Sequence, residues 1–468
     1  MNIKSFLLFL SLLLLSFSLS VRATERQRVI VTTDAEIDDE CSLVRFLLYL
    51  NDFDVEAIIS SSSQYHAHDH KWAGDYWYLP YVDAYTKVYP NLVKHDTNYP
   101  SPDKVRNLFY LGNVDTQNEM EKVTPGSQRI VEVLLDKSDS RPVWLQAWGG
   151  INTIARALKT IEEEYPDEME RVAQKMRLYL IWEQDETYQQ YIRPHWGRFN
   201  ILTIVCDQFI TYFYHWKKYL LPEHQHYLDS VWMNEHILKG HGALCSLYKA
   251  HENGDFRSEG DSPAFFHTIP NGLRSHENPG WGGWGGRFVK VRENTWMDPV
   301  NEIGYQYPEG RWYTGNAWGR SRLKMEIPND RDLLLYLKPM WRWIDALQND
   351  FAARADWCVN DYAHANHQPI VKCNLKDVCV KKGKKIRLSA KGTSDPDGNK
   401  LIYRWWVYTE ASSYKKQISI KNSNQKTASI RIPEDANRGD QIHVILEVKD
   451  NGTPQLTRYS RVVITVDR

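Results

Sequence analysis

Between residues 28 and 182, apolar runs of strand length alternate with segments whose apolar residues recur at helical spacing. The strand-like runs are 29–33, 55–60, 142–146 and 178–182, and the helical segments are 41–50, 72–85, 130–135 and 151–161. Strands that alternate with helices in this way build a parallel sheet with helices on its faces. We therefore expect an α/β domain with an open, mainly parallel sheet flanked by helices.

Past residue 200 this periodicity weakens, and tryptophan, glycine and histidine accumulate. Residues 280–318 carry too much glycine for a helix and predict a structured loop region. A leucine-rich helix is expected over 330–347, and residues 365–369 have the composition of a linker. The first domain is thus expected to span residues 24–365.

The last hundred or so residues have a different character. Short alternating apolar runs occur at 385–390, 401–408, 428–432, 443–448 and 461–466. Turn signals such as Asp395-Pro396-Asp397-Gly398 separate them, which predicts an immunoglobulin-like β-sandwich over residues 366–468. Of the adjacent Trp405 and Trp406, one ring should face inward and the other outward. The two aspartates of the turn either bind a structural calcium or only shape the turn.

The N-terminal 23 residues have the pattern of a secretory signal peptide. They begin with a short polar stretch that carries Lys4, continue through an apolar run, and end in Val21-Arg22-Ala23, a small-x-small cleavage pattern. The apolar run of about 12 residues is shorter than the roughly 20 of a membrane-spanning helix. We expect a secreted or periplasmic protein without a membrane span.

Charge and cysteine content exclude two classes of function. Lysine and arginine total 58 against 59 aspartate and glutamate residues, so no basic excess exists to bind a nucleic acid polymer. The six cysteines form no paired Cys-x-x-Cys motifs, and zinc is not indicated. Cys373 and Cys379 either close a short disulfide loop or remain free. The sequence leaves both a monomer and a homo-oligomer open.

Residues 32–40 read Thr-Thr-Asp-Ala-Glu-Ile-Asp-Asp-Glu, at the point where the first strand ends and its helix begins. In an α/β sheet this is the edge at which ligands bind. Crowded carboxylates repel one another, and a calcium ion, which prefers oxygen ligands, relieves the repulsion. Asp34 and Asp39 would then share one ion while Asp38 faces the adjoining pocket. Alternatively, Asp38 and Asp39 only cap the helix and favour its dipole.

This acidic stretch resembles the last three acids of the nucleoside hydrolase signature D-x-D-x-x-x-D-D, with Thr32 in place of the first. Residues 149–153, Gly-Gly-Ile-Asn-Thr, resemble a second turn of that family, and residues 261–264, Asp-Ser-Pro-Ala, resemble its late aspartate motif. Where the family has a histidine before that aspartate, this chain has Gly260. The resemblance implies a similar fold. Because Gly260 replaces the histidine, no residue is evident that could protonate a departing base.

The resemblance also implies roles for individual residues. The implied calcium ligands are Asp34, Asp39, Asp261 and the backbone carbonyl of Asn152. Asp34 would also orient and deprotonate the attacking water, and Asp38 and Gln64 would bind sugar hydroxyls. The implied reaction is hydrolysis of an N-glycosidic or furanosidic bond, with inversion at the anomeric carbon.

A closer resemblance is to secreted nucleoside-hydrolase-like proteins of polysaccharide-degrading bacteria, a family described as cellulose-binding, in which such a domain precedes a small β-sandwich. The shared segments are residues 42–49, Trp148-Gly149-Gly150, residues 259–263, and residues 278–288, which read Asn-Pro-Gly-Trp-Gly-Gly-Trp-Gly-Gly-Arg-Phe. The features of that family, with its two-domain arrangement, extend over nearly the whole mature chain. In the last of them, Trp281 and Trp284 either form a sugar-binding wall or plug the core, and we place Trp284 and Arg287 in the pocket.

Other polar residues have open roles. Glu183 and Asp185 follow a predicted strand and could bind sugar or protonate a leaving group, or form a solvated loop. His66, His68 and His70 could bind metal, and His267 could act in acid/base chemistry or be structural. The leading interpretation is a secreted calcium-dependent glycosidase. The alternatives are a non-catalytic carbohydrate-binding protein that uses the same pocket and a periplasmic nucleoside scavenger.

Overall fold

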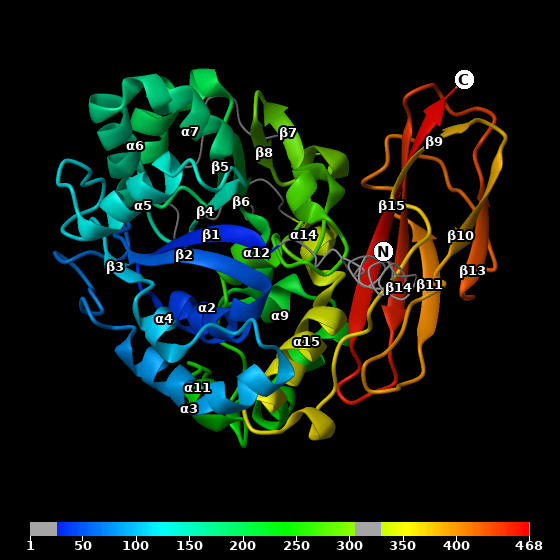
Figure 1. The fold of residues 1–468 in the computed structure, drawn as a ribbon, viewed down its shortest axis with the longest axis horizontal. Helices are drawn as coiled ribbons and strands as arrows, with labels where there is room; N and C mark the ends of the chain where they lie inside the picture. The colour runs from blue at the N-terminus through cyan, green and yellow to red at the C-terminus, as the bar shows by residue number, and fades with distance from the viewer. Residues whose placement is uncertain (1–25, 305–328, 468) are drawn as a thin grey trace, which may run out of the picture.

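The computed structural model describes residues 26–304 and 329–467. The secretory signal predicted at residues 1–23 lies outside these ranges, as does the part of the glycine-rich region that follows residue 304. Figure 1 shows a large α/β body beside a narrower body of strands that contains the C-terminus.

The α/β body is built on an eight-stranded sheet with the order β3-β2-β1-β4-β5-β6-β8-β7. All neighbouring strands pair in parallel except β7 and β8. The strands are β1 (Gln27–Thr33), β2 (Phe53–Ser60), β3 (Phe109–Leu111), β4 (Val143–Ala147), β5 (Met176–Ile181), β6 (Leu202–Cys206), β7 (Val289–Arg292) and β8 (Thr295–Met297). The mainly parallel sheet predicted from the sequence is confirmed.

Helices cover both faces of this sheet, as Figure 1 shows. One layer contains α5 (Pro125–Leu135), α6 (Asn152–Glu164) and α7 (Met169–Lys175), and the other contains α2 (Ile37–Leu48), α3 (Leu79–His95) and α15 (Ile344–Trp357). Successive residues of a strand point to opposite faces. Val29 and Val31 therefore join the second layer, whereas Ile30 joins the first. Both faces are buried, which explains the continuous apolar runs of these strands.

Three expectations about the elements are corrected. The helix expected at 72–85 begins only at Leu79, because residues 75–78 form turns. The single helix expected over 330–347 is two helices, α14 (Asp330–Trp341) and α15, separated by Arg342 and Trp343. Strands β7 and β8 lie inside the region expected to be a loop. They have only three or four residues each, too few for a periodic pattern to be recognised.

The C-terminal body is a sandwich of two sheets, with strand orders β10-β13-β12 and β11-β14-β15-β9. Its strands are β9 (Asp377–Lys381), β10 (Lys385–Ser389), β11 (Ile402–Val407), β12 (Ile420–Lys421), β13 (Thr427–Arg431), β14 (Gln441–Lys449) and β15 (Thr457–Asp467). The neighbours pair antiparallel except β9 and β15. Trp405 lies in the core between the sheets, and Trp406 packs against the α/β domain. The predicted sandwich and the opposite orientation of the two rings are confirmed.

The sandwich contacts the α/β domain through the first half of β15. The carbonyl groups of Asn271 and Gly272 accept hydrogen bonds from the N–H groups of Tyr459 and Arg461, at 2.9 and 3.2 Å. The buried Arg461 guanidinium also donates to the carbonyl oxygens of Leu273 and Gly282, at 2.6 and 2.7 Å. A loop of the first domain thus continues the sheet edge of the second.

Two further expectations concern cysteines and membrane segments. Cys373 and Cys379 are free thiols, so the disulfide loop that the sequence permitted is not formed. None of the helices in residues 26–304 and 329–467 combines the length and the apolar character of a transmembrane segment.

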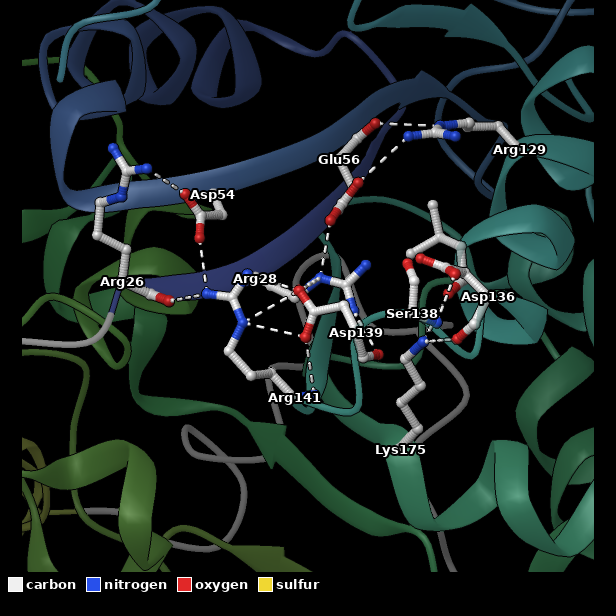
Figure 2. Close-up of polar contacts among 11 residues, drawn as sticks. Arg26, Arg28, Asp54, Glu56, Arg129, Asp136, Ser138, Asp139, Arg141 and Lys175 are labelled. Carbon is white, nitrogen blue, oxygen red and sulfur yellow. Dashed lines mark hydrogen bonds and ion pairs between the residues drawn. The ribbon is translucent and has the colours of Figure 1, made fainter.

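An ion-pair network joins the amino-terminal ends of β1, β2 and the loop before β4 (Figure 2). Arg28, only 3% exposed, bonds Glu56 at 2.7 Å and Asp139 at 3.4 Å. Asp139 also accepts a hydrogen bond from Arg141, which, with the nearby Arg28, lowers the pKa of that carboxyl to about 2. The network lies at the edge of the sheet opposite the acidic stretch. It fastens strands that are far apart in the sequence.

Replacement of Arg28 by alanine is expected to lower the free energy of unfolding by about 1–3 kcal/mol, because two carboxylates lose their buried partner but keep some contact with water. Arg26→Ala is the matched control, since Arg26 is 36% exposed and bonds only Asp54 among the pairs of this network. Its loss should cost at most about 1 kcal/mol. Urea unfolding measures the free energies of unfolding of the two variants, and equal losses in these free energies would contradict the prediction.

Candidate active site

Four aspartates meet at the carboxyl-terminal edge of the sheet. Asp34 follows β1 directly, and Asp38 and Asp39 lie in the first turn of α2. Asp261 precedes α12 (Ser262–Phe266). Carboxylate oxygens of Asp38, Asp39 and Asp261 lie within 4.8 Å of one another, and all three residues are buried. Asp34, 1% exposed, joins them as a neighbouring charge. We call these four residues the carboxylate cluster.

Burial and mutual repulsion disfavour the ionised form of the carboxylate cluster. Burial, and then the charge of Asp34, raise the pKa of Asp38 to about 7. Burial and the neighbouring aspartates also raise the pKa values of Asp39 and Asp261 well above the usual range. In the described part of the chain, Oδ2 of Asp34, Oδ1 of Asp38 and Oδ2 of Asp261 accept no hydrogen bond. Buried carboxylate oxygens are normally paired or bound to a metal, so this set fits an oxygen-seeking cation.

The conformation after β1 brings three of these carboxylates together. Ala35 has a φ of 61°, which is rare for a residue with a side chain and turns the chain sharply into α2. The backbone N–H of Glu36 donates to Oδ1 of Asp34, and the Thr33 hydroxyl donates to Asp39. Asp34 and Asp39 therefore have fixed orientations before any ligand binds.

A buried ion pair positions Asp261. The Glu259 carboxylate accepts hydrogen bonds from Arg45 of α2 at 2.9 Å and from the Tyr248 hydroxyl at 2.7 Å. Ser262 donates to the same carboxylate and to the hydroxyl of Ser42, which is also on α2. Because α2 carries Asp38 and Asp39, these bonds fix the distance between the two helix starts. The segments 42–49 and 259–263 thus form one structural unit.

The Gly149-Gly150 turn passes directly beside Asp34. A Cβ at Gly149 would lie 2.7 Å from the Cβ of Asp34, and one at Gly150 would overlap the carbonyl oxygen of Ser62. Asp185 clamps the turn by accepting the N–H groups of Ile151 and Asn152. Thr187 fills the remaining acceptor positions of Asp185. The sequence suggested a substrate-binding role for Asp185, but its contacts give it a positioning role.

Asn152 and Gln64, both expected near the ligand, have different surroundings. Asn152 is the first residue of α6, where a carbonyl accepts the N–H four residues later, so it is poorly placed to bind an ion. Its side chain bonds Ser61, Ser62 and two backbone carbonyls. Gln64 lies at the same sheet edge, where its N–H donates to the Gln184 carbonyl. Its Nε2 is buried and donates no hydrogen bond within the described residues, so it remains available for a hydroxyl.

Three pocket assignments are corrected. The Glu183 carboxylate is fully buried and accepts two hydrogen bonds from Gln189, at 2.9 and 3.0 Å. Trp284 is fully buried and packs against Tyr459 of the sandwich. Arg287 is 3% exposed and pairs with Glu302. These side chains stabilise the interior and the domain contact and do not line the carboxylate cluster.

The glycine-rich motif supports the cluster indirectly. A Cβ at Gly285 would overlap the carbonyl of Pro263 and the N–H of His267, so the loop packs on the backbone of α12. The Tyr179 hydroxyl holds the Gly285 carbonyl at 3.0 Å. This close approach turns the Trp284 ring inward. The motif therefore supports the helix that follows Asp261.

The histidines considered from the sequence do not join the cluster. His68 bonds Asp75 and Asp115, and His70 bonds Asp69, so they do not share one site. His267 is fully buried among aromatic rings, and burial lowers its pKa to about 3. Within residues 26–304 and 329–467, Asp38, Asp39 and Asp261 form the metal-compatible group of side chains.

Sequence reasoning did not identify the residues that border the cluster on the other side. The Tyr214 hydroxyl donates to Glu36 at 3.3 Å, and burial together with Asp38 and Asp34 raises the pKa of Glu36 to about 9. A Cβ at Gly260 would lie 2.6 Å from Oδ2 of Asp38 and 3.0 Å from the Phe213 ring. The position at which the nucleoside hydrolase motif has a histidine is therefore closely packed. Tyr214 and Phe213 lie in irregular structure, which has no periodic signal.

Comparisons with known proteins agree with this architecture. A model of the family "Cellulose-binding Sde182, nucleoside hydrolase-like domain" matches residues 28–288. A model of "Cellulose-binding protein Sde0182, C-terminal domain" matches residues 385–466. The comparison with curated proteins finds no match.

Among solved structures, a nucleoside hydrolase-related hypothetical protein from Saccharophagus degradans, associated with carbohydrate metabolism, is 31% identical over 95% of this chain and 100% of its own, with a TM-score of 0.76. The type III effector XopQ, solved with adenosine diphosphate ribose, is 8% identical over 72% of this chain and 95% of its own, with a TM-score of 0.31. The family models and the first structure span both domains. The chain belongs to the cellulose-binding Sde182 family of nucleoside hydrolase-like proteins.

Proposed function

We propose that this protein is a secreted, calcium-dependent hydrolase of N-glycosidic or furanosidic bonds in polysaccharide or nucleoside utilisation. The observation that carries the proposal is the carboxylate cluster, with three buried oxygens that accept no hydrogen bond among the described residues. A cluster of this kind at the ligand edge of an α/β sheet is costly to maintain without a function.

Asp38, Asp39 and Asp261 would hold the calcium ion, with Asp34 beside them. When bound, the ion neutralises the aspartates, lowers the pKa of water and anchors hydroxyl groups. Carboxylate oxygens match its preference for oxygen ligands. The raised pKa values of the aspartates are the expected consequence of crowding without a cation.

The side chains of the cluster would divide the reaction between them. Asp34, oriented by the N–H of Glu36, takes the proton of the attacking water through its unpaired Oδ2. The oxygen of Asp38 that does not contact the ion and the Nε2 of Gln64 would bind hydroxyl groups of the sugar. Attack of water from one face of the ring would expel the leaving group on the other face, where it takes a proton from solvent, and would invert the anomeric carbon.

A second candidate function is carbohydrate binding without turnover. The observation in its favour is the packed environment of Gly260, which leaves no histidine beside Asp38 to assist a leaving base. The family description as cellulose-binding agrees with this alternative. In that case the same cluster would recognise sugar hydroxyls through the ion.

The test is release of reducing sugar or free base from a panel of nucleosides, furanosides and plant-polysaccharide oligomers. Asp34→Asn, which keeps the shape of the side chain, should lower the rate at least about a hundredfold, the usual contribution of a general base. A chelator should abolish turnover, and added calcium should restore it. Asp83→Ala is the control, because Asp83 is exposed and, among the described residues, pairs with Arg106 alone.

Turnover that persists in Asp34→Asn or in the presence of chelator would contradict the proposed mechanism. Calcium-dependent binding of a panel member without turnover would instead support the binding function.

A further inference from the structure

A cavity of about 250 Å³ lies between the two domains, away from the carboxylate cluster. The α/β domain contributes Trp341 and Asp345, at the junction of α14 and α15, and the sandwich contributes Arg404, Trp406, Glu447 and Lys449. Small-molecule sites often form between domains and enclose roughly 300–1,000 Å³. This cavity is therefore slightly smaller than a complete site.

A second hollow, of about 740 Å³, adjoins the first. It shares Arg404, Glu447 and Lys449 with the cavity and adds Tyr403 and Gln425, among others. β11 is the outermost strand of its sheet, and the N–H of Trp405 donates to the Ser423 carbonyl at 2.7 Å. The two hollows lie beside this strand and share three lining residues. We call the combined surface the junction groove.

Strand register explains how the groove forms. Arg404 and Trp406 are alternate residues of β11 and point to the same face, which is the face toward the α/β domain. In the strand register, Arg404 lies opposite Glu447 of β14, and Glu447 lies opposite Tyr459 of β15. Tyr459 is buried in the domain contact, whereas Arg404 is exposed. The two domains therefore touch along β15 and at Trp406, whereas Arg404 lies outside this contact, at the open side of the groove.

The floor of the cavity is aromatic. The Trp406 ring is partly buried and packs 6.1 Å from Trp343 and 5.2 Å from the Arg342 guanidinium. Its Nε1 donates to Glu447 at 3.3 Å, which holds the indole in place. Trp341 provides a second half-buried ring at the same cavity. Rigid rings with a polar edge bind ligands that present an apolar face and a polar rim.

The charges around the rings are largely balanced. Lys449 bonds Asp345 at 2.7 Å and lies 3.9 Å from Glu447. Lys338 and Arg342 both pair with Glu410. Arg404 has no ion-pair partner among the described residues. Paired charges do not favour an anion or a cation, but their donors and acceptors bind hydroxyl groups well.

We propose that the junction groove binds a neutral oligosaccharide, with a sugar ring on Trp406 and hydroxyl groups bonded to Arg404, Glu447 and Lys449. A sugar ring has C–H groups on its face and hydroxyls around its rim, which matches rings bordered by paired charges. The groove does not include the carboxylate cluster. Binding there is therefore independent of the proposed hydrolysis.

The test is isothermal titration calorimetry of the full-length protein with cellohexaose and xylohexaose. Arg404→Ala should weaken binding at least tenfold, because the exposed guanidinium is lost without disturbing the core. Trp406→Ala should weaken it further, but Trp406 also packs on Trp343, so its thermal unfolding is measured in parallel. Arg387→Ala is the matched control, since Arg387 is an exposed arginine on β10, in the other sheet.

Asp39→Ala separates this proposal from the proposed hydrolysis. It removes a carboxylate of the cluster, whereas Arg404→Ala changes the junction groove. Equal affinities of wild type and Arg404→Ala, with or without a loss in Asp39→Ala, would overturn the proposal, as would no binding of either hexasaccharide by the wild type.

Discussion

Replacing Asp39 with alanine is expected to abolish the stabilisation that calcium gives to the wild-type protein. A ligand present at a thousandfold excess over its dissociation constant adds about 4 kcal/mol to the stability of the folded state, which corresponds to several degrees in the midpoint of thermal unfolding. Asp39 is buried, and its carboxylate lies within 4.8 Å of those of Asp38 and Asp261. Without it, the cation loses a central ligand.

Thermal unfolding with calcium and with chelator measures this effect. In chelator, Asp39→Ala should unfold at or above the wild-type temperature, because one of four crowded buried charges has been removed. This distinguishes loss of the ion from general destabilisation. Asp83→Ala should keep the full calcium response. A calcium response in Asp39→Ala equal to that of the wild type, or none in the wild type, would refute the assigned site.

Substitution of Gly272 by alanine is expected to destabilise the protein by more than about 3 kcal/mol, an exceptional cost for one added methyl group. Gly272 has a φ of 95°, and a Cβ there would overlap the carbonyl of Tyr459 on β15. The backbones of the two domains approach closely at this point. The methyl group must therefore push β15 away from the α/β domain and break the hydrogen bond from Arg461 to Gly272.

Gly240→Ala is the matched control, because Gly240 has a φ of 84° and no atom of the described residues lies within 4 Å of an added Cβ. It should cost only about 1 kcal/mol, from backbone strain alone. Urea unfolding of both variants separates strain from overlap. Similar losses in the free energy of unfolding for the two variants would contradict the prediction and show that the domain contact adjusts to the added methyl group.

The sequence was most informative where structure is regular and local. Buried parallel strands such as β1 and β4 are continuous apolar runs, and α2 and α6 have clear apolar faces. Strands β7 and β8 contain four and three residues and leave no such pattern. The division between α14 and α15 was missed because both halves are apolar and no glycine marks the turn between them.

The same contrast holds for the candidate site. Asp34, Asp38 and Asp39 are neighbours in sequence, so one strand-to-helix junction was enough to bring them together. Asp261 could be placed only through a motif resemblance. Trp284 and Arg287 were misplaced because a glycine-rich segment allows its rings to face either way, and only the close packing of Gly285 on α12 decides the direction.

The domain contact has a consequence for how such proteins can evolve. Tyr408, Ile445 and Tyr459 of the sandwich belong to the hydrophobic core of the α/β domain, and the loop at Asn271 covers the start of β15. A recombination event that transferred residues 366–468 to another protein would expose these side chains and an unpaired strand edge, which promotes aggregation. The sandwich is therefore not an exchangeable module, and we expect the two domains to be inherited together.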